Sequence, residues 1–227
     1  MRVVWLGLTL LVASALFAAV PAVDLAASHL FYDGSAFPVA QNRLIEALRL
    51  TLYGAEDLAA VLTLGLALVT GWTGRALWRL APRDWLFSFA VFAAGPGLLV
   101  NGILKPLWGR ARPDAVAEFG GMARFTPAWA ISDQCQADCS FVSGEMAGAV
   151  ALAVLFGLLA RGGRAVWALV WIIPLFTAWQ RVAAGRHFLS DVVLSAVMVA
   201  LIAAVLARLF YPVRAPASAV DFPPPTP

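Results

Sequence analysis

The chain has 227 residues, of which 62% are hydrophobic and only 13% are charged, and its mean hydropathy is +0.83. This composition excludes an ordinary water-soluble domain and indicates an integral membrane protein. The formal net charge is +3, and the basic residues, nearly all arginines, are spread among the apolar segments. No basic tract is present in the sequence, which argues against nucleic-acid binding.

Six apolar segments predict an all-α bundle of six membrane-spanning helices, since a span takes about 20 mostly apolar residues. In chain order they cover roughly residues 3–23, 50–72, 85–104, 141–160, 165–179 and 189–211. The first also resembles a signal peptide, but we favour a retained helix. We expect residues 1–211 to form a single domain and the Pro-rich residues 212–227 to be a disordered cytoplasmic tail.

The segment between the first two spans, residues 24–50, is more polar than its neighbours. Val39, Leu44, Ile45 and Leu48 recur there at helical spacing, opposite polar residues. This pattern predicts an amphipathic helix that lies on the membrane surface.

Arginines between the spans indicate the orientation in the bilayer. With six spans, one side receives Arg2, Arg75, Arg79, Arg83, Arg161, Arg164, Arg208 and Arg214. An equal number of basic residues falls on the other side, so the count alone does not decide. We assign the first side to the cytoplasm, because several cations of the second group look committed to a site. Both termini are then cytoplasmic, in the inner membrane.

Both cysteines, Cys135 and Cys139, lie in the polar loop between the third and fourth spans. A C-x3-C pair without further ligands nearby does not make a zinc site. A disulfide and two free thiols both remain open, and an oxidising compartment would favour the disulfide.

Three segments on the non-cytoplasmic side place charged residues beside membrane spans. They are KPLWGRARPD (residues 105–114), FVSGEMAG (141–148) and QRVAAGRHFLSD (180–191). Charges at the border of a bilayer are costly unless they are used or solvated, so each segment is a candidate for a functional site.

The cations of these segments are suited to a phosphate. Lys105, Arg112 and Arg181 would repel one another without an anion between them, and phosphate oxygens accept hydrogen bonds from guanidinium and ammonium groups. Ser143 and Gly144 precede an apolar helix, whose N-terminal N–H groups would add donors.

His187 and Asp191 are four residues apart and therefore share one face of a helix. An aspartate that accepts from one imidazole nitrogen leaves the other free to attack, which predicts a nucleophilic histidine and a phosphohistidine intermediate. Glu145 is a candidate general acid for the leaving group if it is protonated. Alternatively, Glu145 is a counter-ion that neutralises the cation cluster.

The three segments together resemble the three-part signature of the type 2 phosphatidic acid phosphatase superfamily, which is related to vanadium haloperoxidases. The matching residues are Lys105, Arg112, Pro113, Ser143, Gly144, Arg181, His187 and Asp191. The resemblance implies a six-helix membrane enzyme that forms a phosphohistidine without a metal or other cofactor. It also implies an active site on the extracytoplasmic face.

The sequence departs from the family pattern at three positions. Val142 and Gln180 replace a proline and a serine, and Glu145 replaces the histidine that protonates the leaving group in the family. The second motif with glutamate at this position resembles that of a bacterial subgroup that includes lipid A phosphatases.

These features predict a membrane lipid phosphatase that acts on a phosphomonoester or pyrophosphate. Phosphatidate, phosphatidylglycerol phosphate, undecaprenyl diphosphate and lipid A are the candidate substrates. A lipid phosphotransferase and a non-catalytic protein that binds anionic lipid are the alternatives. We expect membrane lipids but no nucleic acid as partners, and leave the oligomeric state open.

Other charged residues receive less specific interpretations. We expect Arg110, Arg124 and Arg186 to face water or anionic lipid, although all three are close in sequence to the site segments. Glu56 and Asp57 are expected to be interfacial or structural.

Overall fold

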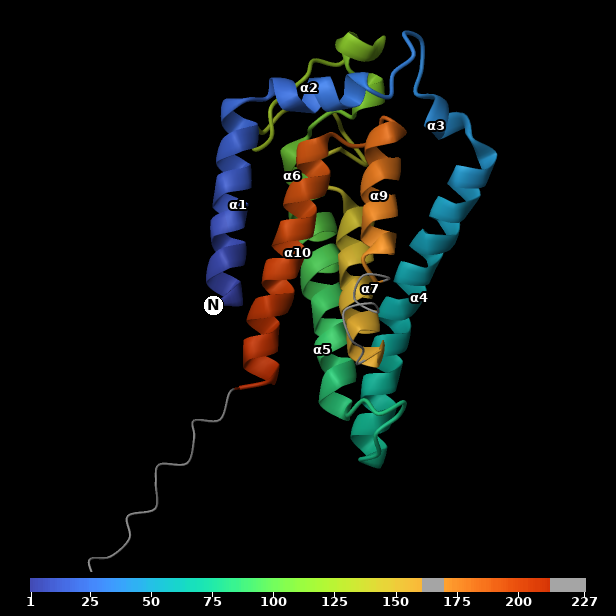
Figure 1. Cartoon of the computed structure of the whole chain (residues 1–227), viewed down its shortest axis with the longest axis vertical. Coiled ribbons are helices and arrows are strands. Elements are labelled where there is room, and N and C mark those ends of the chain that lie inside the picture. The colour runs from blue at the N-terminus through green and yellow to red at the C-terminus, as the bar shows by residue number, and fades with distance from the viewer. Residues whose placement is uncertain (161–169, 213–227) are drawn as a thin grey trace, which may run out of the picture.

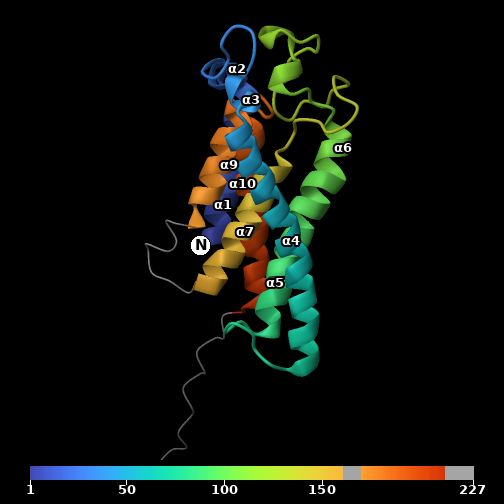
Figure 2. The ribbon, with the colours of Figure 1, turned by 90° about the vertical axis from the view of Figure 1, so that its right-hand side faces the viewer.

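The computed structural model describes residues 1–160 and 170–212, and helix is the dominant structure of this part of the chain. The long helices run side by side as a bundle (Figures 1 and 2). They are α1 (Arg2–Ala19), α4 (Arg43–Thr73), α5 (Pro82–Phe92) with its π-helical continuation η1 (Ala93–Leu104), α7 (Gly144–Ala160), α9 (Ile172–Ala183) and α10 (Leu189–Phe210). The short elements are α2 (Ala22–His29), α3 (Pro38–Gln41), α6 (Lys105–Trp108), η2 (Pro113–Ala115) and η3 (Ala117–Phe119).

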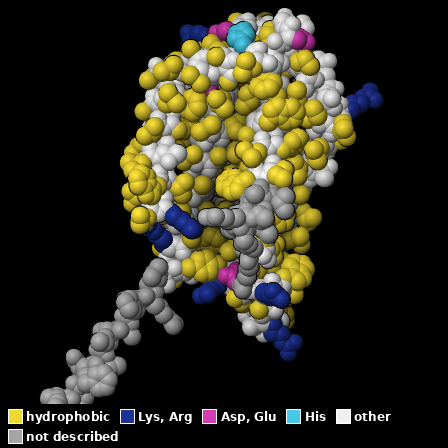
Figure 3. All heavy atoms as spheres, viewed as in Figure 1, with side chains coloured by type: hydrophobic (Ala, Val, Ile, Leu, Met, Phe, Trp, Pro, Cys, Tyr) yellow, Lys and Arg dark blue, Asp and Glu magenta, His cyan; other side chains and the backbone are white. Residues whose placement is uncertain are grey.

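Four helical segments are long and apolar enough to cross a membrane, and α7 is a shorter apolar helix. Hydrophobic side chains cover most of the bundle face drawn in Figure 3. The prediction of an all-α integral membrane bundle is therefore confirmed. Parts of the fifth predicted span and of the predicted tail, with Arg161, Arg164 and Arg214, fall outside the described residues.

The predicted surface helix of residues 39–49 is wrong. Most of that segment forms the first turns of α4, which continues without a break into the second span. Asn42 begins this helix, because its side-chain oxygen accepts from the backbone N–H groups of Leu44 and Ile45, each at 3.1 Å. The helix that lies across the end of the bundle is instead α2 (Figure 1).

Helix α7 is the centre of the bundle, since it contacts α4, α5, η1, α9 and α10. Its sequence is rich in alanine and glycine, and small residues let neighbouring helices approach closely. The N-terminus of α7 is thereby placed in the middle of one end of the bundle.

The π-helical run η1 contains Pro96, which has no N–H to donate and would crowd the preceding turn of an α-helix. A wider π-type turn accommodates it. This run carries Asn101 and leads directly to Lys105, and both side chains line the cavity described below.

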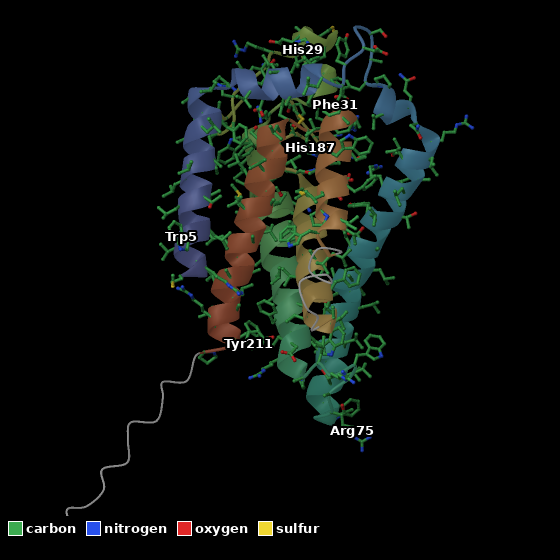
Figure 4. The ribbon with its side chains drawn as sticks, viewed as in Figure 1. Trp5, His29, Phe31, Arg75, His187 and Tyr211 are labelled. Atoms are coloured by element: carbon green, nitrogen blue, oxygen red, sulfur yellow. A yellow bond between two sulfur atoms is a disulfide. The ribbon has the colours of Figure 1, made fainter. Side chains whose placement is uncertain are left out.

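The two ends of the bundle carry different residues and short elements. His187 lies at the end that also carries α2, whereas Arg75 and Tyr211 lie toward the opposite end (Figure 4). The start of α1 and the end of α10 also point away from the end that holds His187 (Figure 1). The bundle therefore has one end on which the site residues gather.

Candidate functional site

A cavity of about 660 Å³ opens among α4, η1, the loop that precedes α7, α7 itself and the connection between α9 and α10. Residues from all three sequence segments reach it. Of the predicted site residues, it is lined by Lys105, Arg112, Gly144, Glu145, Arg181 and His187. The structure thus brings together groups that are up to 82 positions apart in the chain, from 105 to 187.

Asp138 occupies part of the cation cluster. Its carboxylate lies 3.2 Å from Nζ of Lys105 and 2.5 Å from a terminal nitrogen of Arg112, whose Nε donates to the Asp138 carbonyl at 2.9 Å. Burial raises the pKa of Asp138, but the charges of Arg112 and Lys105 outweigh it and bring the pKa below its usual value. These two cations are therefore arranged to hold an anion.

Arg181 is the most buried cation that lines the cavity, with a side chain only 4% exposed. Its Nε is buried and has no hydrogen-bond partner within the described part of the chain. An N–H group in this position costs free energy unless it is satisfied, so it is well placed to donate to a bound anion.

His187 is buried, and its Nδ1 lies 2.8 Å from the backbone carbonyl of Ser140. A carbonyl oxygen only accepts, so Nδ1 carries the proton and Nε2 keeps its lone pair. Burial, and next to it the charges of Arg181, Lys105 and Arg112, hold the pKa of His187 well below its usual range. The ring is therefore neutral, which is the form that can act as a nucleophile.

The direct His187–Asp191 hydrogen bond that the spacing predicts is not formed, because the nearest carboxylate oxygen is 3.9 Å from Nδ1. Asp191 instead accepts from the backbone N–H of Phe188 at 2.9 Å, near the start of α10, and from the hydroxyl of Ser140 at 2.5 Å. Since the Ser140 carbonyl accepts from His187, Asp191 positions the histidine through Ser140.

Arg110 is fully buried rather than facing water or lipid, so that expectation is wrong. It donates to Asp191 at 2.7 Å, to Asp24 at 2.8 Å and to the carbonyl of Thr126 at 2.9 Å. Asp24 also accepts from the backbone N–H and the hydroxyl of Ser190. This buried network fixes Asp191 from behind, out of contact with the cavity.

The other two arginines of that group differ from Arg110. Arg124 is exposed, in agreement with the sequence-based expectation. Arg186 lines the cavity and forms a half-exposed ion pair with Asp114 at 2.8 Å.

Ser143 and Gly144 have different roles at the start of α7. The Ser143 N–H donates to the carbonyl of Asp191 at 3.2 Å, and its side-chain oxygen accepts from the N–H of Met146 at 3.3 Å. Ser143 is thus buried and caps the helix, and its N–H is not available to an anion. Gly144 lines the cavity, where an added Cβ would lie 3.0 Å from Oδ1 of Asn101.

Glu145 forms two ion pairs, with Arg49 at 2.8 Å and with Arg181 at 3.3 Å. Arg49 comes from α4 and also binds Glu46 at 2.6 Å. This arrangement supports the counter-ion interpretation of Glu145 over the general-acid interpretation. Sequence reasoning missed Arg49, because it falls among the polar residues of the predicted surface helix.

Cys135 and Cys139 are joined by a disulfide, one of the two alternatives that the sequence left open. The bond closes the short loop that carries Asp138, whose backbone adopts a left-handed conformation with φ of 52°. Among residues 1–160 and 170–212, no group of three or more His, Cys, Asp or Glu is arranged to hold a metal ion.

The fold and the cavity define a class of protein: a helical membrane protein that can hold a phosphate-sized anion against a neutral histidine. A model of the PAP2 superfamily matches residues 85–215. A lipid A 4'-phosphatase of Rhizobium leguminosarum is 32% identical over 210 residues, which are 86% of this chain and 88% of that protein. A lipid A 4'-phosphatase of Francisella tularensis subsp. novicida is 36% identical over 132 residues, or 57% of this chain and 60% of that protein.

Among solved structures, the chain is similar to a transmembrane PAP2-type phosphatidylglycerolphosphate phosphatase from Bacillus subtilis. The TM-score is 0.56 at 22% sequence identity, with 92% of this chain and 95% of that one covered. The chain belongs to the PAP2 superfamily. The prediction of a membrane lipid phosphatase is thereby confirmed.

Proposed function

We propose that this protein hydrolyses a phosphate monoester of a lipid A-type glycolipid and releases inorganic phosphate. The reaction passes through a phosphohistidine at the periplasmic face of the inner membrane. The observation that carries this proposal is that Lys105, Arg112 and Arg181 line the same cavity as the neutral imidazole of His187. The similarity to lipid A 4'-phosphatases, over 88% of the Rhizobium leguminosarum protein, supports the substrate.

In the first step the phosphate displaces Asp138 and binds the three cations. Nε2 of His187 attacks phosphorus, the bond from phosphorus to the lipid oxygen breaks, and a phosphohistidine forms. Negative charge builds on the equatorial oxygens in the transition state, where the guanidinium and ammonium groups stabilise it. In the second step water attacks phosphorus, the bond to Nε2 breaks, and inorganic phosphate leaves.

Two carboxylates support these steps without taking part in bond formation or cleavage. Asp191 positions His187 through Ser140, which keeps the proton on Nδ1 and the lone pair on Nε2. Glu145 balances the charges of Arg181 and Arg49, which would otherwise repel each other.

The size and lining of the cavity suit a polar headgroup larger than phosphate. Its volume of about 660 Å³ lies within the range that holds drug-sized ligands. The proposed orientation rests on Arg75 and Arg79 in the α4–α5 connection and Arg83 at the start of α5, which is the end of the bundle remote from His187 (Figures 1 and 4). Because the equal number of cations on the other side includes those of the site, these arginines support a cytoplasmic placement of that end.

Phosphate release by the purified protein tests this function. Wild type and His187→Ala are assayed in detergent micelles with lipid A, phosphatidylglycerol phosphate, phosphatidate and undecaprenyl diphosphate. We expect the highest kcat/KM with lipid A, loss of activity in His187→Ala, and a phosphoryl-enzyme in wild type that is trapped by rapid acid quench. Full activity of His187→Ala would overturn the phosphohistidine, and a preference for another lipid would overturn the substrate.

A further inference from the structure

The proposed reaction also needs a group that donates a proton to the leaving lipid oxygen. In the family pattern a histidine implies this step, but Glu145 takes its place here, where it accepts a hydrogen bond from Arg49 and is ion-paired with Arg181. A proton on Glu145 would remove the negative charge on which both ion pairs depend. The donor is therefore a different group of the same cavity.

Glu56 on α4 lines the cavity and is only 5% exposed. Within the described part of the chain its carboxyl group has no hydrogen-bond or ion-pair partner. An ionised carboxylate removed from water is very costly without a partner, so a group in this position is suited to carry a proton. Charged neighbours of Glu56 are Glu145 on α7, Asp57 on α4 and Arg181 on α9.

The bundle makes specific room for this side chain. Gly148 of α7 faces it, and a Cβ at that position would collide with the Glu56 carboxylate oxygen. Gly148 is one turn below Gly144 and Glu145 on the same helix, and all three line the cavity together with His187. Glu56 therefore lies on the membrane side of the phosphate-binding end, which is the side from which a lipid oxygen would leave.

We propose that Glu56 is the general acid and base of the reaction. This assignment rests on the proposed phosphatase function. As Nε2 of His187 bonds to phosphorus, the electron pair of the breaking P–O bond goes to the lipid oxygen, which takes the Glu56 proton and leaves as a hydroxyl. The Glu56 carboxylate then accepts a proton from the water that attacks the phosphohistidine. Inorganic phosphate leaves, and both residues return to their starting states.

Leaving-group dependence tests this assignment. Wild type, Glu56→Gln and the matched control Glu118→Gln, an exposed glutamate of η3 outside the cavity, are assayed with a lipid alkyl phosphate and with p-nitrophenyl phosphate. We expect Glu56→Gln to lose about 10²–10⁴-fold in kcat with the alkyl ester, the usual contribution of a general acid, at little change in KM. With the aryl ester the loss is expected to be much smaller, since nitrophenolate leaves without a proton. Glu118→Gln is expected to match wild type.

Other results would overturn the assignment. Wild-type activity of Glu56→Gln on the alkyl ester excludes an acid role, and an equal loss on both esters indicates a structural role. A rise in KM alone indicates substrate binding. If wild type itself released no phosphate, or if His187→Ala remained active, the proposed function and not the role of Glu56 would fail. Thermal unfolding of Glu56→Gln confirms that the variant is folded.

Discussion

Replacing Arg110 with methionine is expected to destabilise the protein and to lower its activity, although Arg110 does not line the cavity. Its guanidinium group is fully buried and donates to Asp191, to Asp24 and to the carbonyl of Thr126. Methionine has a similar volume but no donor. The substitution would leave two buried carboxylates without their cation.

Removing one partner of a buried ion pair costs about 3–5 kcal/mol. For a chain of this size, 1 kcal/mol corresponds to roughly 2–4 °C in Tm, so we expect a decrease on the order of 10 °C. The effect on activity follows from the contacts of Asp191, which holds Ser140, whose carbonyl accepts from His187. Misplacing a reacting group by about 1 Å can cost about 10²-fold in rate, and we expect a kcat loss of up to that size.

Thermal unfolding in detergent and phosphatase assays well below Tm measure the two effects separately. The matched control is Arg186→Met, which removes a half-exposed ion pair with Asp114. Such pairs contribute about 0–1 kcal/mol, so its Tm is expected to stay close to wild type. If Arg110→Met had the Tm of the Arg186→Met control and wild-type kcat, the buried network would have neither role.

Three further predictions concern the charges around the phosphate. Glu145→Gln is expected to bind inorganic phosphate more tightly, seen as a larger thermal stabilisation by phosphate, with kcat reduced less than tenfold; a loss of about 10²-fold would restore its acid role. Asp138→Asn removes the carboxylate that competes for Lys105, so the inhibition constant for phosphate should fall, whereas Asp133→Asn should not change it. The chain has two histidines, so a His29→Gln background leaves His187 as the histidine that reacts with diethyl pyrocarbonate. Because the pKa of His187 is lowered, the rate of inactivation should stay constant from pH 8 down to about 6.5 and decrease only below it. A decrease centred at the ordinary histidine pKa would contradict this.

The same lowered pKa sets a sign for stability. The unfolded chain takes up the His187 proton at a higher pH than the folded chain does. Below about pH 6.5 the unfolded state therefore binds more protons, and the contribution of His187 to folding stability decreases as the pH falls.

Much of the architecture followed from apolar patterning, and the cavity followed from motif spacing. Segment lengths predicted the long helices, and four of the described helices have span length. The charged residues of the three signature segments converge because these segments meet at the same end of the bundle.

The errors have a common physical cause. A charged residue next to a span has the same sequence pattern whether it faces water or a buried partner. Arg110 and Asp24 are 86 positions apart, and nothing local indicates that they pair. Likewise, helical periodicity placed Leu44 and Ile45 on a helix but could not tell a surface helix from the first turns of a span. Asn42 as a helix start was the local signal that could have corrected this.

The replacement of histidine by Glu145 is best understood together with Arg49. An additional guanidinium group beside Arg181 would raise the repulsion among the cations, and a carboxylate on α7 compensates it. Asp138 does the same for the other cations, but from a loop rather than from the central helix. A substrate phosphate can therefore displace Asp138 at a modest conformational cost, whereas Glu145 is held in place by α7. The site thus has one exchangeable and one permanent counter-ion, which leaves the proton to be supplied by a third carboxyl group, Glu56.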